Sequence, residues 1–351
     1  MDFEQNNNRS EPANSVSSES VSDLRQGKPT LEPAKKGIGW KIFWGVVLAL
    51  SIIANFVLLM ALIGVIMFFA TGRTVDLNEK VLRDGPRRAK IAVISVEGII
   101  NDEQFENVYR QLNYARNDRR VKGLIVRINS PGGTISGSDR IHNEICRFRQ
   151  EEGKPVVAFM QGIAASGGYY ASVACERIVA EPTAITGSIG VMFGHFVLQE
   201  LLEKKLGIQP VIITSGPKKD WPSSFQPITE EQRQYIQDKL ISPAYNRFME
   251  VVANGRQALS LDDVRCLADG SIYGAQEARN VNLIDEIGYL DEAIEQVKLL
   301  AGIEKAQVVE YSEPFSLTGF LSSGSRSFLK FDKDKLYELC TPQVLYLWSI
   351  Y

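Results

Sequence analysis

Short apolar runs and helix-type patterns follow one another along the chain from Lys90 onward. Runs rich in Val, Ile and Ala predict buried strands, whereas apolar residues that recur every three or four positions predict one face of a helix. The predicted strands are 90–100, 123–130, 154–162 and 210–216, with two short strands within 177–191. The predicted helices are 105–121, 138–151, 197–207 and 230–254, with a second helical region over 261–300. Thr229 and Gln232 give the helix at 230–254 a capping-box start. Strands separated by helices indicate an α/β architecture with a largely covered sheet.

The longest apolar run lies nearer the N-terminus. No charged residue occurs from Ile42 to Ala70, a run of about 29 residues, and roughly 20 apolar residues suffice to cross a bilayer. A cleaved signal peptide is the competing interpretation, because residues 70–72 offer a small-x-small site. The apolar core of such a peptide is typically only about 7 to 15 residues long, however. We therefore expect a retained transmembrane anchor over 38–72.

The charges that flank this run predict its orientation. Four lysines lie on its N-terminal side and four arginines follow its other end: Lys28, Lys35, Lys36 and Lys41, then Arg73, Arg83, Arg87 and Arg88. The positive-inside rule keeps the lysine side in the cytoplasm, and the arginines weaken that preference. We expect the N-terminus in the cytoplasm and the rest of the chain on the extracytoplasmic side of the cell membrane, periplasmic or extracellular.

The remaining segments complete the expected organisation. Residues 1–37 are rich in Asn, Ser, Glu and Pro with almost no apolar clustering, so they cannot bury enough surface to offset the entropy of ordering. We expect a disordered cytoplasmic tail there, a linker over 73–89, a folded core over 90–312 and a C-terminal tail over 313–351. The end of that last tail is aromatic-rich, and we assign no element to it.

Composition and charge exclude some classes of protein. With 351 residues, 44% of them hydrophobic, the chain can build a substantial core, and its net charge of −3 lacks the concentrated basic excess of a nucleic-acid-binding protein. The four cysteines are scattered without metal-type spacing, which makes a structural zinc site improbable; they are Cys146, Cys175, Cys266 and Cys340. Only His142 and His195 are available for histidine chemistry.

Two small-residue turns follow predicted strands and carry candidate chemistry. In Pro131-Gly132-Gly133 the proline fixes φ and the glycines allow backbone N–H groups to turn toward a ligand, as half of an oxyanion hole requires. Ser166, in the stretch AASGGYY, stands at a strand-to-helix junction, where its hydroxyl can attack and the N–H of Gly167 can face a developing oxyanion. An ordinary turn and close packing of small side chains are the alternative interpretations of these two stretches.

A nucleophilic serine needs a base, and a lysine pair follows the predicted strand at 210–216. Lysine is almost wholly protonated at neutral pH, so the base would have to be desolvated. Lys218 and Lys219 lie in a Gly-Pro turn, and a solvated surface turn is the alternative interpretation. Ser188, in AITGSIGVM, offers a hydroxyl that could hold a neutral lysine amine without adding charge; a β-bulge is its alternative.

Taken together, these pieces resemble one family. The motifs INSPGG, GIAASGGYYASVAC, ITGSIGV, SGPKKD and ADGSIYGAQEARNVNLIDEIG occur in the order found in the bacterial signal peptide peptidase A (protease IV) family, over about residues 91–302. The short, single-core form of that family also has an N-terminal anchor. The resemblance implies the α/β spiral of repeated β-β-α units shared by the Clp protease and crotonase superfamily, preceded here by one transmembrane helix.

The resemblance also implies residue roles. Ser166 matches the nucleophile, Lys219 the general base and Ser188 the serine that orients the lysine, while Gly167 and Gly133 match the backbone oxyanion donors and Gly132 does so less closely. The family commonly has an aromatic residue before its lysine, and this chain has Lys218 there. The domain at 90–312 would then be a Ser-Lys peptidase that needs neither a metal nor a cofactor.

The expected function follows from these roles. Lysine takes the serine proton as the hydroxyl attacks a peptide carbonyl, backbone amides stabilise the tetrahedral anion, and water releases the acyl-enzyme. The family implies hydrophobic peptide substrates, namely remnant signal peptides after secretory processing, contact with membrane lipid, no nucleic acid, and a homo-oligomer whose active sites lie between neighbouring subunits.

Three alternatives remain open on the sequence alone. His195 could replace the lysine in a Ser-His peptidase, although no acidic partner stands out. The chain could be a catalytically inactive membrane scaffold of the same fold, but a scaffold has no need for Ser166, Ser188 and Lys219 together. A crotonase-like acyl-CoA enzyme would also use an oxyanion hole, but that function would not explain the transmembrane anchor.

Overall fold

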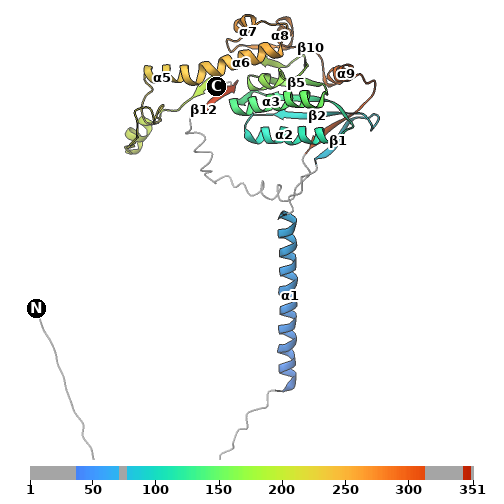
Figure 1. Ribbon diagram of the computed structural model, residues 1–351. Coiled ribbons are helices and arrows are strands. Elements are labelled where there is room, and N and C mark those ends of the chain that lie inside the picture. Colours follow the sequence, from blue (N-terminus) through green and yellow to red (C-terminus); the bar gives the residue numbers. More distant parts are fainter. Residues whose placement is uncertain (1–36, 71–76, 313–342, 349–351) are drawn as a thin grey trace, which may run out of the picture. The chain divides into compact units, whose positions relative to one another are not determined.

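The computed structural model describes residues 37–70, 77–312 and 343–348, and the chain divides into two compact units, 1–72 and 73–351. In the first unit, α1 (Ile38–Ala70) is one uninterrupted helix (Figure 1). Its segment Gly39–Ile66 is long and apolar enough to cross a membrane, judged by length and composition. The tail expected over 1–37 lies, except for Gly37, outside the described residues, as does 313–342 of the expected C-terminal tail.

The second unit is built on a mainly parallel sheet. Its strand order is β1-β11-β2-β3-β5-β6-β10, and β7 pairs with β5 and with β9. The strands are β1 (Asn78–Arg83), β2 (Lys90–Glu97), β3 (Val121–Ser130), β5 (Val156–Ala165), β6 (Arg177–Ala180), β7 (Ile185–Gly187), β9 (Ile272–Gly274), β10 (Glu286–Ile287) and β11 (Gln307–Ser312). Only the β1–β11 and β7–β9 pairings in this sheet are antiparallel. The strands predicted at 90–100, 123–130, 154–162 and within 177–191 are confirmed.

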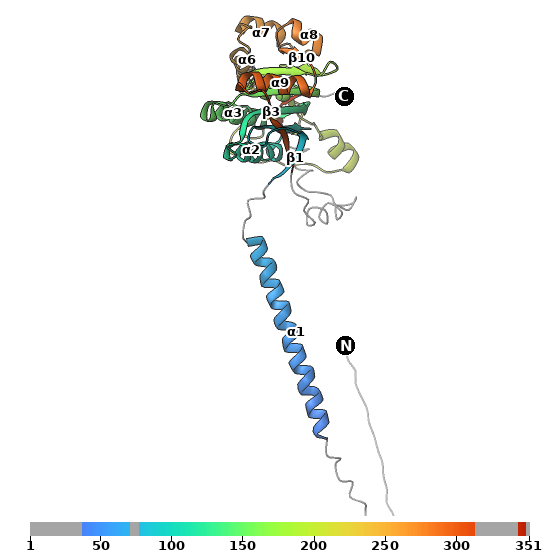
Figure 2. The ribbon, with the colours of Figure 1, turned by 90° about the vertical axis from the view of Figure 1, so that its right-hand side faces the viewer.

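Helices cover both faces of the sheet because successive side chains of a strand point to opposite sides. Ala92 and Ile94 of β2 belong to the core formed with α2 (Asp102–Asn117) and α3 (Ile135–Glu152). Ile91 and Val93 belong to a second core with α9 (Leu290–Ala301). The two cores lie on opposite sides of the same strands (Figures 1 and 2).

The remaining helices all follow β5 along the chain. They are α4 (Gly167–Ser172), α5 (Glu230–Ile236), the π-helical turn η2 (Gln237–Ile241), α6 (Ser242–Gly255), α7 (Leu261–Leu267) and α8 (Ala275–Asn280). The elements α5, η2 and α6 follow one another without a gap, which confirms the predicted helix at 230–254. The predicted capping box is also present, since Thr229 accepts from the Gln232 N–H and Gln232 accepts from the Thr229 N–H.

One predicted element is wrong, because the predicted strand at 210–216 is not a strand. The predicted helix at 197–207 is present in shortened form, with residues 199–200 α-helical and η1 (Leu201–Leu206) a π-helical turn. Val211 is 83% exposed and Ile213 is 93% exposed. An apolar run forms a strand only when another strand's backbone pairs with it, and within the described part of the chain none does. This exposed segment, 196–213, is called the apolar arm below, and it projects from the body of the unit (Figures 1 and 2).

A small second sheet contains a strand from the C-terminal segment. Here β12 (Gln343–Leu347) pairs antiparallel on one side with β4 (Gly132–Thr134) and on the other with β8 (Met192–Gly194). The sequence pattern assigned no element to the residues of β12.

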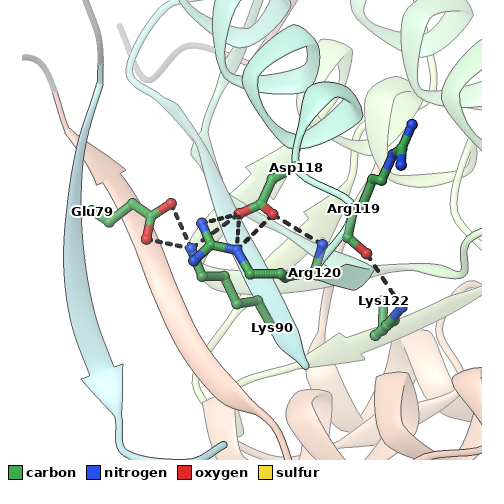
Figure 3. Close-up of polar contacts among 6 residues, drawn as sticks. All are labelled: Glu79, Lys90, Asp118, Arg119, Arg120 and Lys122. Atoms are coloured by element: carbon green, nitrogen blue, oxygen red, sulfur yellow. Dashed lines mark hydrogen bonds and ion pairs between the residues drawn. The ribbon is translucent and has the colours of Figure 1, made fainter. Parts of the chain in front are cut away.

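A buried lysine joins the edge of the main sheet to its helical layer (Figure 3). Lys90 is 1% exposed, and its Nζ donates to Glu79 Oε1 at 2.7 Å and to Asp118 Oδ2 at 3.0 Å. Burial acts to raise the pKa of Asp118, but hydrogen bonds from Arg120 and Lys90 outweigh it and hold that pKa well below its usual range. A depressed carboxylate pKa stabilises the fold above the ordinary value of about 3.9, and this contribution is lost as the pH falls below it.

We predict that Lys90→Met destabilises the protein by about 2–3 kcal/mol at pH 7, because Glu79 then loses its ion pair with the buried lysine, while Asp118 keeps only its ion pair with Arg120. The matched control is Lys122→Met, since Lys122 is an exposed lysine on the neighbouring strand β3 and should change stability by less than about 0.5 kcal/mol. Thermal unfolding of the detergent-solubilised chain, followed by circular dichroism, measures both. Equal melting temperatures for the two variants would contradict a stabilising role for the ion pairs of Lys90.

Candidate active site

Ser166 lies at the junction that the sequence predicts, between the end of β5 and the start of α4. Its φ is 52 and its ψ is −113, a combination that residues with a Cβ rarely adopt. The Ser166 N–H donates to the carbonyl of Gly187 at 2.8 Å, and the residue is 1% exposed. Ser166 is therefore a buried serine in a strained backbone conformation at a strand-to-helix turn.

Ser188 lies beside it at the end of the neighbouring strand. The strands β5 and β7 run parallel with Ala165 opposite Gly187, so the next residues in register are the two serines. Ser188 also has φ 52, is 7% exposed and donates its N–H to the carbonyl of Ser271 at 2.7 Å. The structure thus brings together two buried serines that share the same positive φ.

The glycines predicted as oxyanion donors border the same point. A Cβ added to Gly132, whose φ is 102, would lie 2.7 Å from the backbone N of Gly167. A Cβ added to Gly133 would lie 2.0 Å from the carbonyl oxygen of Ile100. Only glycine allows the backbone to approach this closely. Gly132, Gly133 and Gly167 therefore meet next to Ser166, at the ends of the parallel strands β3 and β5.

Lys219 is not brought to this point. It lies in the turn beyond the apolar arm, with its N–H bonded to the carbonyl of Gly216 at 3.1 Å, and its side chain is exposed. Within residues 77–312 and 343–348 its Nζ has no hydrogen bond, ion pair or ring contact. Lys218, in contrast, has its Nζ 5.0 Å from the ring centroid of Trp221 and 4.8 Å from that of Tyr235. Lys218 thus lies against two aromatic rings, whereas Lys219 makes no such contact with the described residues.

A cavity lies against Ser188. Its lining includes Ser188, Val191, Gln237, Tyr245 and Leu347, and no lysine is among the residues that line it.

The two histidines have other partners. His195 Nε2 lies 3.1 Å from the carbonyl oxygen of Ser223. His142 lies beside Cys146, with 3.8 Å between Nε2 and Sγ, and burial lowers its pKa to about 4, so its ring is neutral at pH 7. Neither ring contacts Ser166 in the described residues. Nor does any group of three or more His, Cys, Asp and Glu side chains suited to a metal ion occur in that part of the chain.

Sequence reasoning missed the strand that fills the site. Leu345, Tyr346 and Leu347 of β12 lie opposite Thr134, Gly133 and Gly132, and the Trp348 N–H donates to the carbonyl of Pro131 at 2.8 Å. The run QVLYLW is rich in β-branched and aromatic residues, which favour a strand, but a single short apolar run does not reveal its partner.

Comparisons with known proteins identify the family of the chain. The model of peptidase family S49 matches residues 148–304, and the Clp protease model matches residues 81–185. A protein of Enterococcus faecium named "Putative signal peptide peptidase SppA" is 36% identical over 259 residues, which are 71% of this chain and 74% of that protein. The chain belongs to peptidase family S49.

Further relatives carry the same name or activity in longer proteins. "Protease 4" of Haemophilus influenzae is 36% identical over 63% of this chain and 36% of its own length. "Serine protease SPPA, chloroplastic" of Arabidopsis thaliana is 33% identical over 65% of this chain and 34% of its own length. The S49 chain described here is therefore a serine peptidase with a Clp protease-like α/β fold, and the family and fold expected from the sequence are confirmed.

We predict that Ser166→Gly is more stable than Ser166→Ala by about 1 kcal/mol, because glycine relieves the strain of positive φ by more than it costs in chain entropy. Ser172 supplies the matched pair, since it is a buried serine within α4. There the order should reverse, with alanine more stable than glycine by about 0.5–1 kcal/mol. Thermal unfolding of the four variants measures both differences, and the same order at both positions would count against strain at Ser166.

Proposed function

We propose that this S49 peptidase is a membrane-anchored endopeptidase in which Ser166 is the nucleophile and Lys219 the general base. Its substrates would be hydrophobic peptides, above all remnant signal peptides left after secretory processing. The observation that carries the proposal is the meeting of Ser166, Ser188 and the glycine turns at the ends of three parallel strands. The names of the relatives support the same class of substrate.

Each residue has a role that its position supports. The Ser166 hydroxyl attacks the carbonyl of the peptide bond, and the N–H groups of Gly133 and Gly167 donate to the oxyanion that forms. Neutral lysine takes the serine proton and passes it to the leaving amine. Ser188, which follows β7 at the position equivalent to that of Ser166 after β5, holds the lysine amine in place without adding a charge. Water then releases the acyl group by the reverse transfers.

The lysine is proposed to come from a neighbouring subunit of a homo-oligomer. A lysine acts as a base only when it is withdrawn from water, and the Lys219 side chain of this chain is exposed. The cavity beside Ser188 lacks a lysine of its own. The apolar arm that leads to Lys219 exposes several large side chains that another copy could cover: Phe196, Val197, Leu201, Leu206, Ile208, Val211, Ile212 and Ile213.

The anchor fits this chemistry. We propose that residues 38–72 hold the enzyme in the cell membrane, with residues 1–37 in the cytoplasm and the peptidase domain, 90–312, on the other side. The continuous apolar helix α1 and the lysines on its N-terminal side support this arrangement. An enzyme held at the bilayer surface meets hydrophobic peptides where they remain after secretion.

We predict that Ser166→Ala and Lys219→Ala each lower kcat for a synthetic signal peptide in detergent by at least about 1000-fold, because one removes the nucleophile and the other the base. Lys218→Ala and His195→Ala are the matched controls and should stay within about threefold of the wild type, as their side chains have other partners. Peptide fragments are quantified by mass spectrometry. If Lys219→Ala kept full activity and His195→Ala lost it, the general base would be His195 and not Lys219.

An active site shared between neighbouring subunits leads to a second prediction. When the inactive variants Ser166→Ala and Lys219→Ala are co-expressed in equal amounts, mixed oligomers should regain about a quarter of wild-type activity, because one in four interfaces then pairs an intact serine with an intact lysine. A fluorophosphonate probe should label Ser166 only in the Lys219→Ala subunits of those oligomers. Activity that stays absent in verified mixed oligomers would mean that both residues act within one subunit.

A further inference from the structure

Ser130 has a buried hydroxyl that the proposed mechanism does not use. It is the last residue of β3, directly before the turn at 131–133, and it is fully buried. Its Oγ accepts a hydrogen bond from the Gly132 N–H at 3.1 Å and donates to the Gly132 carbonyl oxygen at 3.4 Å. A hydroxyl can do both at once, because it has one proton and two lone pairs. One side chain thus contacts both polar groups of the Gly132 backbone.

The direction of the Gly132 carbonyl fixes the direction of the next N–H. The carbonyl of Gly132 and the N–H of Gly133 belong to one trans peptide unit, in which the two groups point to opposite sides. The Ile100 N–H donates to this carbonyl at 2.8 Å, within the parallel bridge that Ile100 forms with Gly133. The Gly133 N–H therefore points away from Ile100, to the other side of β4.

These contacts distinguish the two glycines of the turn as oxyanion donors. The Gly132 N–H is taken by the Ser130 hydroxyl, so it is not free to donate to an oxyanion. The Gly133 N–H is not bound by Ser130 or by Ile100. The turn also borders the other proposed donor, because a Cβ added to Gly132 would lie 2.7 Å from the backbone N of Gly167. Gly133 is therefore the donor that this turn supplies beside Gly167.

The turn needs a restraint, because a peptide unit between two glycines rotates easily. Neither residue has a Cβ to limit it, and Gly132 already has a φ of 102. A half-turn of this peptide unit would present the Gly132 carbonyl, in place of the Gly133 N–H, to the developing oxyanion. A carbonyl oxygen repels the negative charge that an N–H stabilises. The hydrogen bonds of Ile100 and Ser130 to the Gly132 carbonyl oppose that rotation.

We propose that Ser130 is a positioning residue of the oxyanion hole, whose hydroxyl holds the Gly132–Gly133 peptide so that Gly133 donates to the oxyanion. The proposal rests on the assignment of Ser166 as nucleophile and Gly133 as donor. Ser130 acts through the turn and contacts no substrate atom in this role. Its loss therefore weakens the transition state, in which the oxyanion exists, and leaves substrate binding nearly unchanged.

The test compares the full-length wild type with Ser130→Ala in detergent, on the same synthetic signal peptide. We expect kcat to fall about 10- to 100-fold, because a misplaced donor loses part of the roughly 100- to 1000-fold that a whole donor supplies. KM should stay within about threefold. Ser172→Ala is the matched control, since Ser172 is also fully buried and its hydroxyl donates to the Gly168 carbonyl at 2.8 Å within α4. It should change kcat and KM by less than about threefold.

A peptide aldehyde gives a readout that general destabilisation would not move. The Ser166 oxygen adds to its carbonyl carbon and the serine proton passes to the aldehyde oxygen, which then lies in the oxyanion hole. The inhibition constant should rise in Ser130→Ala by about the factor by which kcat falls. Ser130→Cys, whose thiol is a weaker hydrogen-bond partner, should lie between wild type and Ser130→Ala. It carries the comparison if thermal unfolding shows that Ser130→Ala does not fold.

The Ser166→Ala enzyme separates this proposal from the one on which it rests. If it cleaves the peptide as fast as the wild type, the proposed nucleophile is wrong. If cleavage requires Ser166, three results refute the role of Ser130 while the nucleophile stands: an unchanged kcat in Ser130→Ala, an equal fall in Ser172→Ala, or a lower kcat with unchanged aldehyde inhibition. A fall in kcat matched by weaker aldehyde inhibition, with KM unchanged, supports both proposals.

Discussion

The parallel pairing of β5 with β3 on one side and β7 on the other is the constraint on which the site depends. Parallel strands end at the same edge, so the turns that follow them come together there. In this chain those turns are the glycine turn at 131–133, Ser166 and Ser188. Gly132 and both serines have positive φ, a backbone conformation that does not occur in a regular strand. The sheet supplies the rigidity that holds these strained turns in place, which is why a buried core underlies the chemistry.

The same edge leaves backbone groups of β4 and β8 available for another strand, and β12 takes that place. Tyr346 of β12 packs against Phe248 of α6 and donates its hydroxyl to the Ala244 carbonyl, so the register of β12 is fixed by its backbone pairing and by a side chain that the helices hold.

The proposed base stands apart from this framework. Ser166 and Ser188 are buried at the sheet edge, whereas Lys219 lies beyond an arm of apolar residues that nothing in the described chain covers. Apolar side chains as exposed as Val211 and Ile213 favour association. A site completed by a second subunit would couple catalysis to assembly, because the lysine would be desolvated only when the arm is covered.

The sequence by itself determined the long apolar helix at 38–70, the order of the main strands and helices, and the serine at a strand-to-helix junction. Those features depend on local periods, caps and glycine turns, which a short window of sequence contains. It did not determine the pairing of β12 with β4 and β8, the absence of a strand at 210–216, or the distance between Lys219 and Ser166. Each of these depends on which segment, distant in the sequence, lies close enough in space to pair or pack. Only the tertiary structure decides that, because pairing is a property of two segments and a local pattern describes one.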